Sequence, residues 1–475
     1  MKLRRGARLT LLALATASTV GCSLIPDLTR PTAPVPASYP GDAETAAPAG
    51  QAAADIEWQR YFADPRLQRL IETALAHNRD LRIAVLNIEQ ARAQYQVRRA
   101  DLWPTVNAGA TGSRQPRVDS SGTGSSISST YTAGLQITSY EIDFFGRVRS
   151  LSQAQLAQFL STEEARKTAQ ISLIASVANA WLGLLADDEA LAVTRRTLAT
   201  REDSMKLLQL RFDNGASSEI DLRQAETLLA GARVSLAQLT RQRAQDENAL
   251  ALLLGQPVPA DALSLAAAES TGPEVLPELP AGLPSELLTR RPDIRQAEQQ
   301  LIAANANIGA ARAAFFPRIT LSTSVGSAST ELSGLFKDGS FAWSFAPQLL
   351  LPIFDGGRNQ ANLEVAQVNR DIAIAQYERA VQSAFREVAD ALAGRATLGE
   401  QMRAQQAQAR AEEVRTQLAD LRFRNGAASY LDVLDAQRSL FTAQLAVVQV
   451  QTAERQNRVR LYQVLGGGWK DAEAE

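Results

Sequence analysis

The residue types that most often carry protein chemistry are scarce in this chain. Its 475 residues include one cysteine, Cys22, and one histidine, His77. A disulfide needs two cysteines and a structural zinc site needs about four Cys or His ligands, so the sequence excludes both. His77 lies in the polar turn Ala76-His77-Asn78-Arg79-Asp80, which predicts a residue at a helix terminus and not a catalytic base. We therefore expect no enzymatic activity, no metal and no cofactor.

The single cysteine follows a secretory signal. Basic residues at the N-terminus precede an apolar run, residues 9–20, that is too short for a transmembrane helix. The run ends in Thr19-Val20-Gly21-Cys22, which resembles the lipobox of bacterial lipoproteins, with Thr where Leu is commoner. Residues 1–21 then form a signal peptide and Cys22 becomes the acylated N-terminus. A plain signal peptide with a cysteine beyond the cut is the alternative.

The residues after Cys22 predict a tether on the way to the outer membrane. Ser23 replaces the Asp that often retains lipoproteins in the inner membrane, and residues 22–55 are rich in Pro, Ala and Thr, which favours an extended chain. The net charge is −2 with both signs interspersed, so the sequence has no basic footprint of a nucleic-acid binder.

One stretch of the chain occurs twice. Leu210-Arg211-Phe212-Asp213-Asn214-Gly215-Ala216-Ser217-Ser218-Glu219-Ile220-Asp221 returns 211 residues later as Leu421-Arg422-Phe423-Arg424-Asn425-Gly426-Ala427-Ala428-Ser429-Tyr430-Leu431-Asp432. The same offset joins Leu254-Gly255 to Leu465-Gly466. A fixed offset over this length indicates a duplication, and hence one architecture of two similar halves.

Each copy predicts a helix–turn–helix apex. Asn214-Gly215 and Asn425-Gly426 supply left-handed positions that end one helix. Ser218 with Asp221, and Ser429 with Asp432, have the Ser-x-x-acid spacing that caps the next helix. Two apices at the ends of very long helices predict a protein that contacts something with its tips.

Each half also predicts one β-hairpin, at about residues 104–143 and about 317–353. Tyr131, Ala133, Leu135 and Ile137 alternate with polar residues, as do the aromatic and aliphatic residues from Phe341 onwards. Strands of about ten residues with one apolar and one polar face fit a membrane barrel with a wet interior. Aromatic residues at the strand ends favour a membrane interface over a hairpin on a soluble domain: Trp103, Tyr131, Phe315, Phe316 and Trp343.

Helices account for most of the remaining chain. We expect short helices over 58–77, 80–102 and 293–314, and then a 64-residue helix over 148–211, which is about 95 Å long. We expect no stretch of it to be apolar enough to span a bilayer, so the long helices should bury their apolar stripes against one another. The predicted organisation is repeat 1 over 56–255 with its apex at 211–221, a linker over 256–284, repeat 2 over 285–466 with its apex at 422–432, and a tail over 467–475.

Four strands are too few to close a barrel. The smallest membrane barrels have about eight, and open strand edges are costly in lipid. Two, three or four copies of the chain would supply eight, twelve or sixteen strands. With polar residues facing inward the product is a water-filled conduit, so the predicted function is passage and not catalysis.

Together these features resemble the outer-membrane factor family, the TolC-like group, and within it the lipoprotein subgroup typified by OprM. The resemblance rests on the lipobox, the paired hairpins, the duplicated Arg-Phe-x-Asn-Gly apex and the run from Tyr430 to Arg438. It implies a mainly α fold with membrane β, in which a homotrimer forms a twelve-stranded outer-membrane barrel that continues into a long periplasmic helical barrel. It also implies the exit duct of a tripartite pump, in which an inner-membrane RND transporter supplies energy and a periplasmic adaptor docks on the apices.

The same resemblance assigns roles to residues of the second apex. The family closes its periplasmic mouth with rings of side chains, and the matching positions are Leu431 and Asp435. Three Leu431 would form an apolar iris, and three ionised Asp435 would repel one another and hold a cation. The first apex has Ile220 and Gln224 at these positions. Phe423 stands where close relatives often have Tyr, which removes a hydroxyl latch.

The turn residues of both apices are the adaptor-contacting candidates: Arg211, Phe212, Asn214, Gly215, Arg422, Phe423, Asn425 and Gly426. This role rests on the resemblance, because turn geometry alone also explains them. Two other functions stay open. One is the outer-membrane component of a type I protein secretion system, which uses the same architecture. The other is a non-conducting spacer with a lipid anchor.

Overall fold

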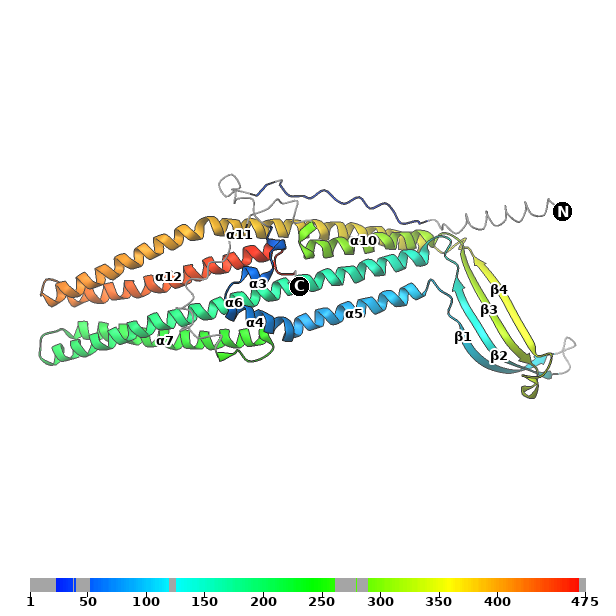
Figure 1. Ribbon diagram of the computed structural model, residues 1–475, viewed down its shortest axis with the longest axis horizontal. Helices are drawn as coiled ribbons and strands as arrows, with labels where there is room; N and C mark the ends of the chain where they lie inside the picture. The colour runs from blue at the N-terminus through cyan, green and yellow to red at the C-terminus, as the bar shows by residue number, and fades with distance from the viewer. Residues whose placement is uncertain are drawn as a thin grey trace. The chain divides into compact units, whose positions relative to one another are not determined.

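The computed structural model describes residues 23–36, 38, 39, 52–118, 125–260, 279 and 289–469. The predicted signal peptide, Cys22, most of the linker and the end of the tail lie outside the described residues. The described chain is mainly helical with one four-stranded sheet (Figure 1). It divides into two compact units: residues 1–32, 87–163 and 296–378 form one, and residues 33–86, 164–295 and 379–475 form the other.

The two halves repeat one order of elements. The first half contains η1 (Ala53–Asp55), α3 (Trp58–Tyr61), α4 (Pro65–His77), α5 (Arg79–Ala100), β1 (Asn107–Val118), β2 (Ser125–Glu141), α6 (Arg147–Asp213) and α7 (Glu219–Leu254). The second contains α10 (Pro292–Ala313), β3 (Arg318–Ser329), η4 (Leu332–Gly334), β4 (Phe341–Leu350), α11 (Arg358–Arg424) and α12 (Tyr430–Val464).

The single helix predicted over 58–77 is wrong, because the chain breaks there into α3 and α4. Asp64 is the N-cap of α4, where its side chain accepts a hydrogen bond from the backbone N–H of Arg66 at 2.8 Å, and Pro65 occupies the first helical position. The Asp-Pro pair therefore starts a new helix. His77 is the last residue of α4, at a helix terminus as predicted.

The strands form one antiparallel sheet in the order β1-β2-β3-β4. The register aligns Ala108, Leu135, Val325 and Trp343 in one row across all four strands, and Asn107, Gln136, Ser324 and Ser344 in the next. Neighbouring rows face opposite sides of a sheet. The predicted alternation is therefore confirmed, with one apolar face that exposes 70% of Trp343 and one polar face.

The two halves meet in this sheet at a pair of glycines. Gly134 of β2 lies opposite Gly326 of β3. A Cβ atom on Gly134 would lie 2.3 Å from the Val325 carbonyl oxygen, and one on Gly326 would lie 2.2 Å from that of Ala133. Only glycine permits this approach of the two backbones.

The helices α6 and α11 each contain 67 residues, so each is about 100 Å long. The expectation that no part of the first long helix could span a bilayer is wrong. By length and composition alone α6 contains an 18-residue window that is apolar enough, although 56% of that window is buried inside the structure. Buried residues such as Ile174, Val177 and Trp181 show that this part of α6 packs against protein.

In each half, one polar side chain connects the end of the hairpin's second helix (α7 or α12) to the start of a shorter helix (α5 or α10). In the first half, Asn78 donates to the Leu253 carbonyl at the end of α7 at 2.9 Å and accepts from the Leu81 N–H at the start of α5. In the second half, Arg291 donates to the Val464 carbonyl at the end of α12 at 3.0 Å. Arg291 stands 213 residues after Asn78, so these are duplicated junctions that satisfy otherwise unpaired helix ends.

Residues 23–36 contain no helix or strand, and three of them are bonded to side chains of α10. Arg312 donates to the Leu24 carbonyl, Asn305 donates to the Pro26 carbonyl at 2.8 Å, and Arg30 pairs with Glu298. Their partners Arg312 and Glu298 stand fourteen residues apart on α10, a rise of about 20 Å. Only an extended chain covers this distance in the six steps from Leu24 to Arg30. The part of the predicted tether from Leu24 to Arg30 is therefore extended and held against α10, whereas Ala53–Asp55 at its other end form η1.

Candidate functional site

The apices end their first helices with the same turn. The Ala216 N–H donates to the Arg211 carbonyl at 2.7 Å and the Gly215 N–H donates to the Phe212 carbonyl at 2.9 Å. The second apex repeats both bonds between Ala427 and Arg422 and between Gly426 and Phe423. These two bonds define a Schellman motif, whose glycine is left-handed, with φ of 71° at Gly215 and 73° at Gly426.

The asparagines of the two turns have another role than predicted. Among the described residues only glycines have positive φ, so Asn214 and Asn425 are not left-handed. Their side chains instead donate to the carbonyls of Leu210 and Leu421, at 2.7 and 2.8 Å. The repeated Arg-Phe-x-Asn-Gly sequence is therefore a set of residues that closes a helix C-terminus.

The next helices start as their spacing predicts. Both members of a capping box are present at Ser218 with Asp221 and at Ser429 with Asp432. In the first, the Asp221 N–H donates to the Ser218 hydroxyl at 3.2 Å, and the Ser218 N–H donates to the Asp221 carboxylate at 3.3 Å. These four residues fix the start of α7 and α12.

The two apices pack against each other within one chain. Leu208, Leu222 and Ala225 of the first hairpin form one buried cluster with Tyr430, Val433 and Leu434 of the second. The Phe423 ring packs 4.7 Å from the Tyr430 ring, and the Arg211 guanidinium lies 4.7 Å above Phe423. Of the adaptor-contacting candidates, Arg211 and Phe423 thus bridge the two apices.

The predicted gate residues lie on the first turns of α12. Leu431 is 50% exposed, and its first-half counterpart Ile220 is 70% exposed, so neither is packed within the chain. Gln224, the counterpart of Asp435, places its side-chain oxygen in a buried position without a hydrogen-bond partner among the described residues. The two apices therefore differ in charge at this position, which holds Gln224 in the first and Asp435 in the second.

Asp435 carries its own counter-ions, which the sequence reasoning missed. Its carboxylate accepts from Arg415 of α11 at 2.6 Å and from Arg438 of α12 at 2.5 Å. The hydrogen bond from Arg415, together with the charges of Arg438 and Arg415, holds the pKa of Asp435 below its usual value. Within this chain Asp435 therefore has two basic partners, which the expectation of three repelling carboxylates did not include.

The signal for this pair was present in the sequence. Arg415 and Asp435 stand ten residues before and after Asn425. Residues equally distant from the turn of a helical hairpin lie opposite each other, so Arg415 could have been assigned to Asp435. In the part of the chain that the structure describes, no group of three or more His, Cys, Asp or Glu residues is arranged to hold a metal ion.

The sequence model of a family described as outer membrane efflux protein matches residues 70–256 and 283–467. The chain belongs to this family. It is 47% identical over 467 residues to the probable efflux pump outer membrane protein TtgC of Pseudomonas putida, covering 97% of this chain and 96% of that protein. It is 46% identical over 462 residues to the outer membrane protein OprJ of Pseudomonas aeruginosa, again covering 97% and 96%.

A solved relative shares the fold of this outer membrane efflux protein. The open state of the MtrE outer membrane channel of Neisseria gonorrhoeae superposes with a TM-score of 0.84 at 43% identity, covering 94% of this chain and 99% of that one. The outer membrane efflux protein described here is thus a TolC-like channel component of the outer membrane and not an enzyme. Its four strands and its long helices are elements that the sequence predicted, whereas the break between α3 and α4 is not.

Proposed function

We propose that three copies of the chain form a twelve-stranded barrel that continues into a periplasmic helical barrel, and that this duct is the exit of a tripartite pump of RND type. The observation that carries the proposal is the pair of free sheet edges. In the described chain β1 and β4 each pair on one side only, and the sheet has an apolar outer face. Such edges are too costly in lipid to remain open, so further copies must pair with them.

Apolar helix surfaces support the same assembly. Val97 of α5 and Val365, Val368 and Ile372 of α11 are exposed in the single chain. They belong to the unit that contains the sheet. Neighbouring copies that close the barrel would bury these side chains, which favours association by the hydrophobic effect.

The cargo is a small molecule delivered by an inner-membrane RND transporter through a periplasmic adaptor docked on the apices. Two relatives at 47% identity are named as an antibiotic efflux pump protein and a toluene efflux pump protein of Pseudomonas putida. These names favour efflux over type I secretion for this chain. Deletion of the gene should sensitise cells to drugs or solvents; a loss of a secreted protein without such sensitivity would favour secretion.

Leu431 and Asp435 close the periplasmic mouth in this proposal. Both stand on the first turns of α12, directly after the second apex, and Leu431 presents an unpacked apolar side chain. Copies of Leu431 around one axis form an apolar constriction. The pairing of Asp435 with Arg415 ties α12 to α11 and holds that constriction in place.

The lipid anchor is Cys22. Leu24 is bonded to Arg312 near the end of α10, six residues before β3 begins, so an acyl chain carried just ahead of the first described residues enters the membrane beside the sheet. Cys22→Ser should abolish labelling with a fatty-acid analogue. Label that persists in this variant would refute lipidation at Cys22.

Planar bilayers test the duct itself. Purified protein should conduct ions, and Leu431→Ala combined with Asp435→Ala should conduct more. A lipid-anchored spacer predicts no conductance from either protein.

A further inference from the structure

The unit that contains the apices also has a cavity of about 700 Å³. Its walls come from α6, α11 and α12 and from the first residues of α10. The volume falls within the range of small-molecule sites, about 300 to 1,000 Å³. The lining combines apolar side chains, such as Ile171 and Leu398, with the amides of Asn179 and Asn457.

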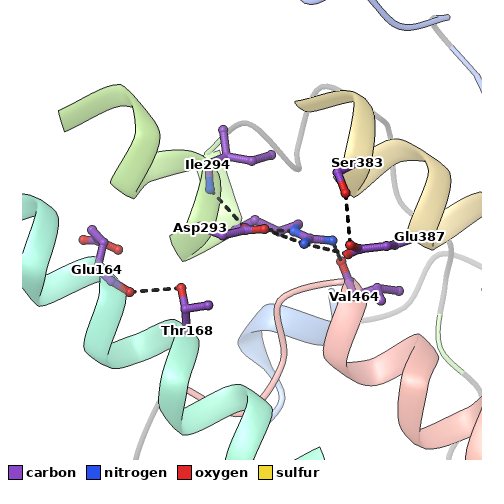
Figure 2. Close-up of polar contacts among 8 residues, drawn as sticks. Glu164, Thr168, Asp293, Ile294, Ser383, Glu387 and Val464 are labelled. Atoms are coloured by element: carbon purple, nitrogen blue, oxygen red, sulfur yellow. Dashed lines mark hydrogen bonds and ion pairs between the residues drawn. The ribbon is translucent and has the colours of Figure 1, made fainter. Parts of the chain in front are cut away.

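The acidic side chains of this cavity are already paired. The buried Arg291 donates to Asp293 through Nε at 3.0 Å and Nη2 at 2.6 Å, and to Glu387 through Nη2 at 2.8 Å. Figure 2 shows Asp293, Glu387 and Val464 gathered around this point. Ser383 and the Ile294 N–H occupy further lone pairs of the two carboxylates. Both acids are therefore held by Arg291, although each remains partly exposed.

Two more arginines line the cavity without partners. Arg386 of α11 and Arg460 of α12 are exposed residues of the cavity wall, and they make no hydrogen bond or ion pair within the described part of the chain. Three arginines against two acids give the lining a net charge of +1. A concave surface of one sign concentrates oppositely charged solutes, and guanidinium groups match the geometry of a carboxylate.

The arginines are not a consequence of the duplicated fold. The positions 211 residues upstream of Arg386 and Arg460 are Ala175 and Ala249. The first half therefore repeats these helices without the charges.

We propose that this cavity binds an organic carboxylate of drug size. Its carboxylate contacts Arg386 and Arg460, and its apolar body lies on Ile171 and Leu398. Binding at this site requires neither the gate nor the pump. A failure of the proposed site therefore leaves the efflux function untouched, and a failure of conductance leaves the site untouched.

The probe is 2-naphthoate, and its neutral amide is the matched comparison. Equilibrium binding is measured on the full-length protein in lipid nanodiscs at about 0.15 M salt, where long-range surface electrostatics is largely screened. We expect saturable binding of the carboxylate and at least about tenfold weaker binding of the amide, since hydrogen bonds to charged groups are strong. Equal binding of the two compounds, or no binding of the carboxylate, would overturn the proposal.

The variant Arg386→Ala with Arg460→Ala should weaken carboxylate binding by about tenfold or more. The matched control removes two arginines elsewhere on α11. Arg403 and Arg410 are exposed and do not line the cavity. Arg403→Ala with Arg410→Ala should bind as the parent protein does. Equal weakening in both double variants would show general electrostatics and overturn the proposal, as would unchanged binding in the first. If the alanine pair melts early, Arg386→Gln with Arg460→Gln carries the same expectation.

Discussion

Arg415 and Asp435 face each other across the second hairpin, with 2.6 Å between the guanidinium Nη2 and the carboxylate Oδ2. Arg415 also pairs with Glu412, and Asp435 also pairs with Arg438. The four charges cancel within one chain. In the duct proposed above, we expect the mouth to be held by this link between α11 and α12 and by the apolar side chain of Leu431, and not by repulsion between carboxylates.

The first prediction concerns this link. Asp435→Ala leaves Arg415 and Arg438 without their shared partner, and Arg415→Ala releases α12 from α11. Each change should raise channel open probability by about two- to fivefold, since partly exposed pairs contribute modestly. Combination with Leu431→Ala should raise it further and make cells permeable to large antibiotics. Single-channel recording and antibiotic susceptibility measure the two effects.

The matched control is Arg424→Ala, which breaks the exposed pair of Arg424 with Asp420 on the same hairpin. This variant should conduct as the parent protein does. Unchanged permeability in the Leu431 and Asp435 double variant, at a normal level of assembled protein, would remove both residues from the gate.

A second prediction concerns pH and the first hairpin. Burial raises the pKa of Asp187 to about 7, and a hydrogen bond with Asp246 and the charges of Asp246 and Asp188 act in the same direction. Arg243, the cation that lowers this pKa, is held by Asp188 at 2.5 Å and Glu247 at 2.8 Å, and Gln242 donates to Asp246. Asp187 is therefore protonated below neutral pH, where it can donate to Asp246.

The sign of the effect follows from linkage. The folded pKa lies above the unfolded value of about 3.9, so the folded state binds more protons between these values, and stability falls as pH rises towards and through 7. The melting temperature should thus be lower at about pH 8.5 than at about pH 5.5. Asp187→Asn keeps a donor at every pH and should flatten this slope, whereas Asp203→Asn, at an exposed pair on the same helix, should not. An unaltered slope in Asp187→Asn would contradict the assignment.

A third prediction separates two helical glycines. A Cβ on Gly309 of α10 would lie 2.5 Å from Ile25 of the tether and 2.7 Å from the Ser150 hydroxyl, whereas one on Gly183 of α6 would meet nothing within 4 Å. Alanine is favoured over glycine in a helix by about 1 kcal/mol. Gly183→Ala should therefore be neutral or stabilising, and Gly309→Ala destabilising. Proteolysis at Arg30 should rise in Gly309→Ala alone; equal protection in both variants would show that the tether does not need this glycine.

A fourth prediction compares the duplicated junctions. Arg291→Met leaves Asp293, Glu387 and the Val464 carbonyl without their partner, and breaking a buried ion pair in this way costs about 3 to 5 kcal/mol. Asn78→Ala removes two neutral hydrogen bonds and should cost about 1 to 3 kcal/mol. Thermal unfolding of the two variants measures the difference. A larger loss of stability in Asn78→Ala than in Arg291→Met would contradict the prediction that the charged junction contributes more.

Local patterns predicted much of this fold. The Ser218 and Asp221 spacing gave a capping box, and alternation around Leu135 and Trp343 gave the two faces of the sheet, because both signals depend on near neighbours in the chain. The break at Asp64 and Pro65 was missed although its signal is local. Arg291 could not be assigned, because its partners Glu387 and Val464 are distant in sequence and only the folded helices bring them together.

At the candidate gate, too, the sequence predicted the positions of residues but not their contacts between helices. Leu431 and Asp435 were named from a resemblance, and their positions next to the turn follow from the duplicated sequence. The pairing with Arg415 depends on the register of two antiparallel helices, and the contact of Arg211 with Phe423 depends on how two hairpins pack. Neither contact follows from the spacing of residues within one helix.

The most direct test of the account is the number of chains in the assembled protein, since β1 and β4 must find partners in neighbouring copies. Native mass spectrometry of the full-length protein released from lipid nanodiscs should give the mass of three chains. A single chain that remains stable in lipid with its four strands inserted would contradict the proposal that neighbouring copies complete the barrel.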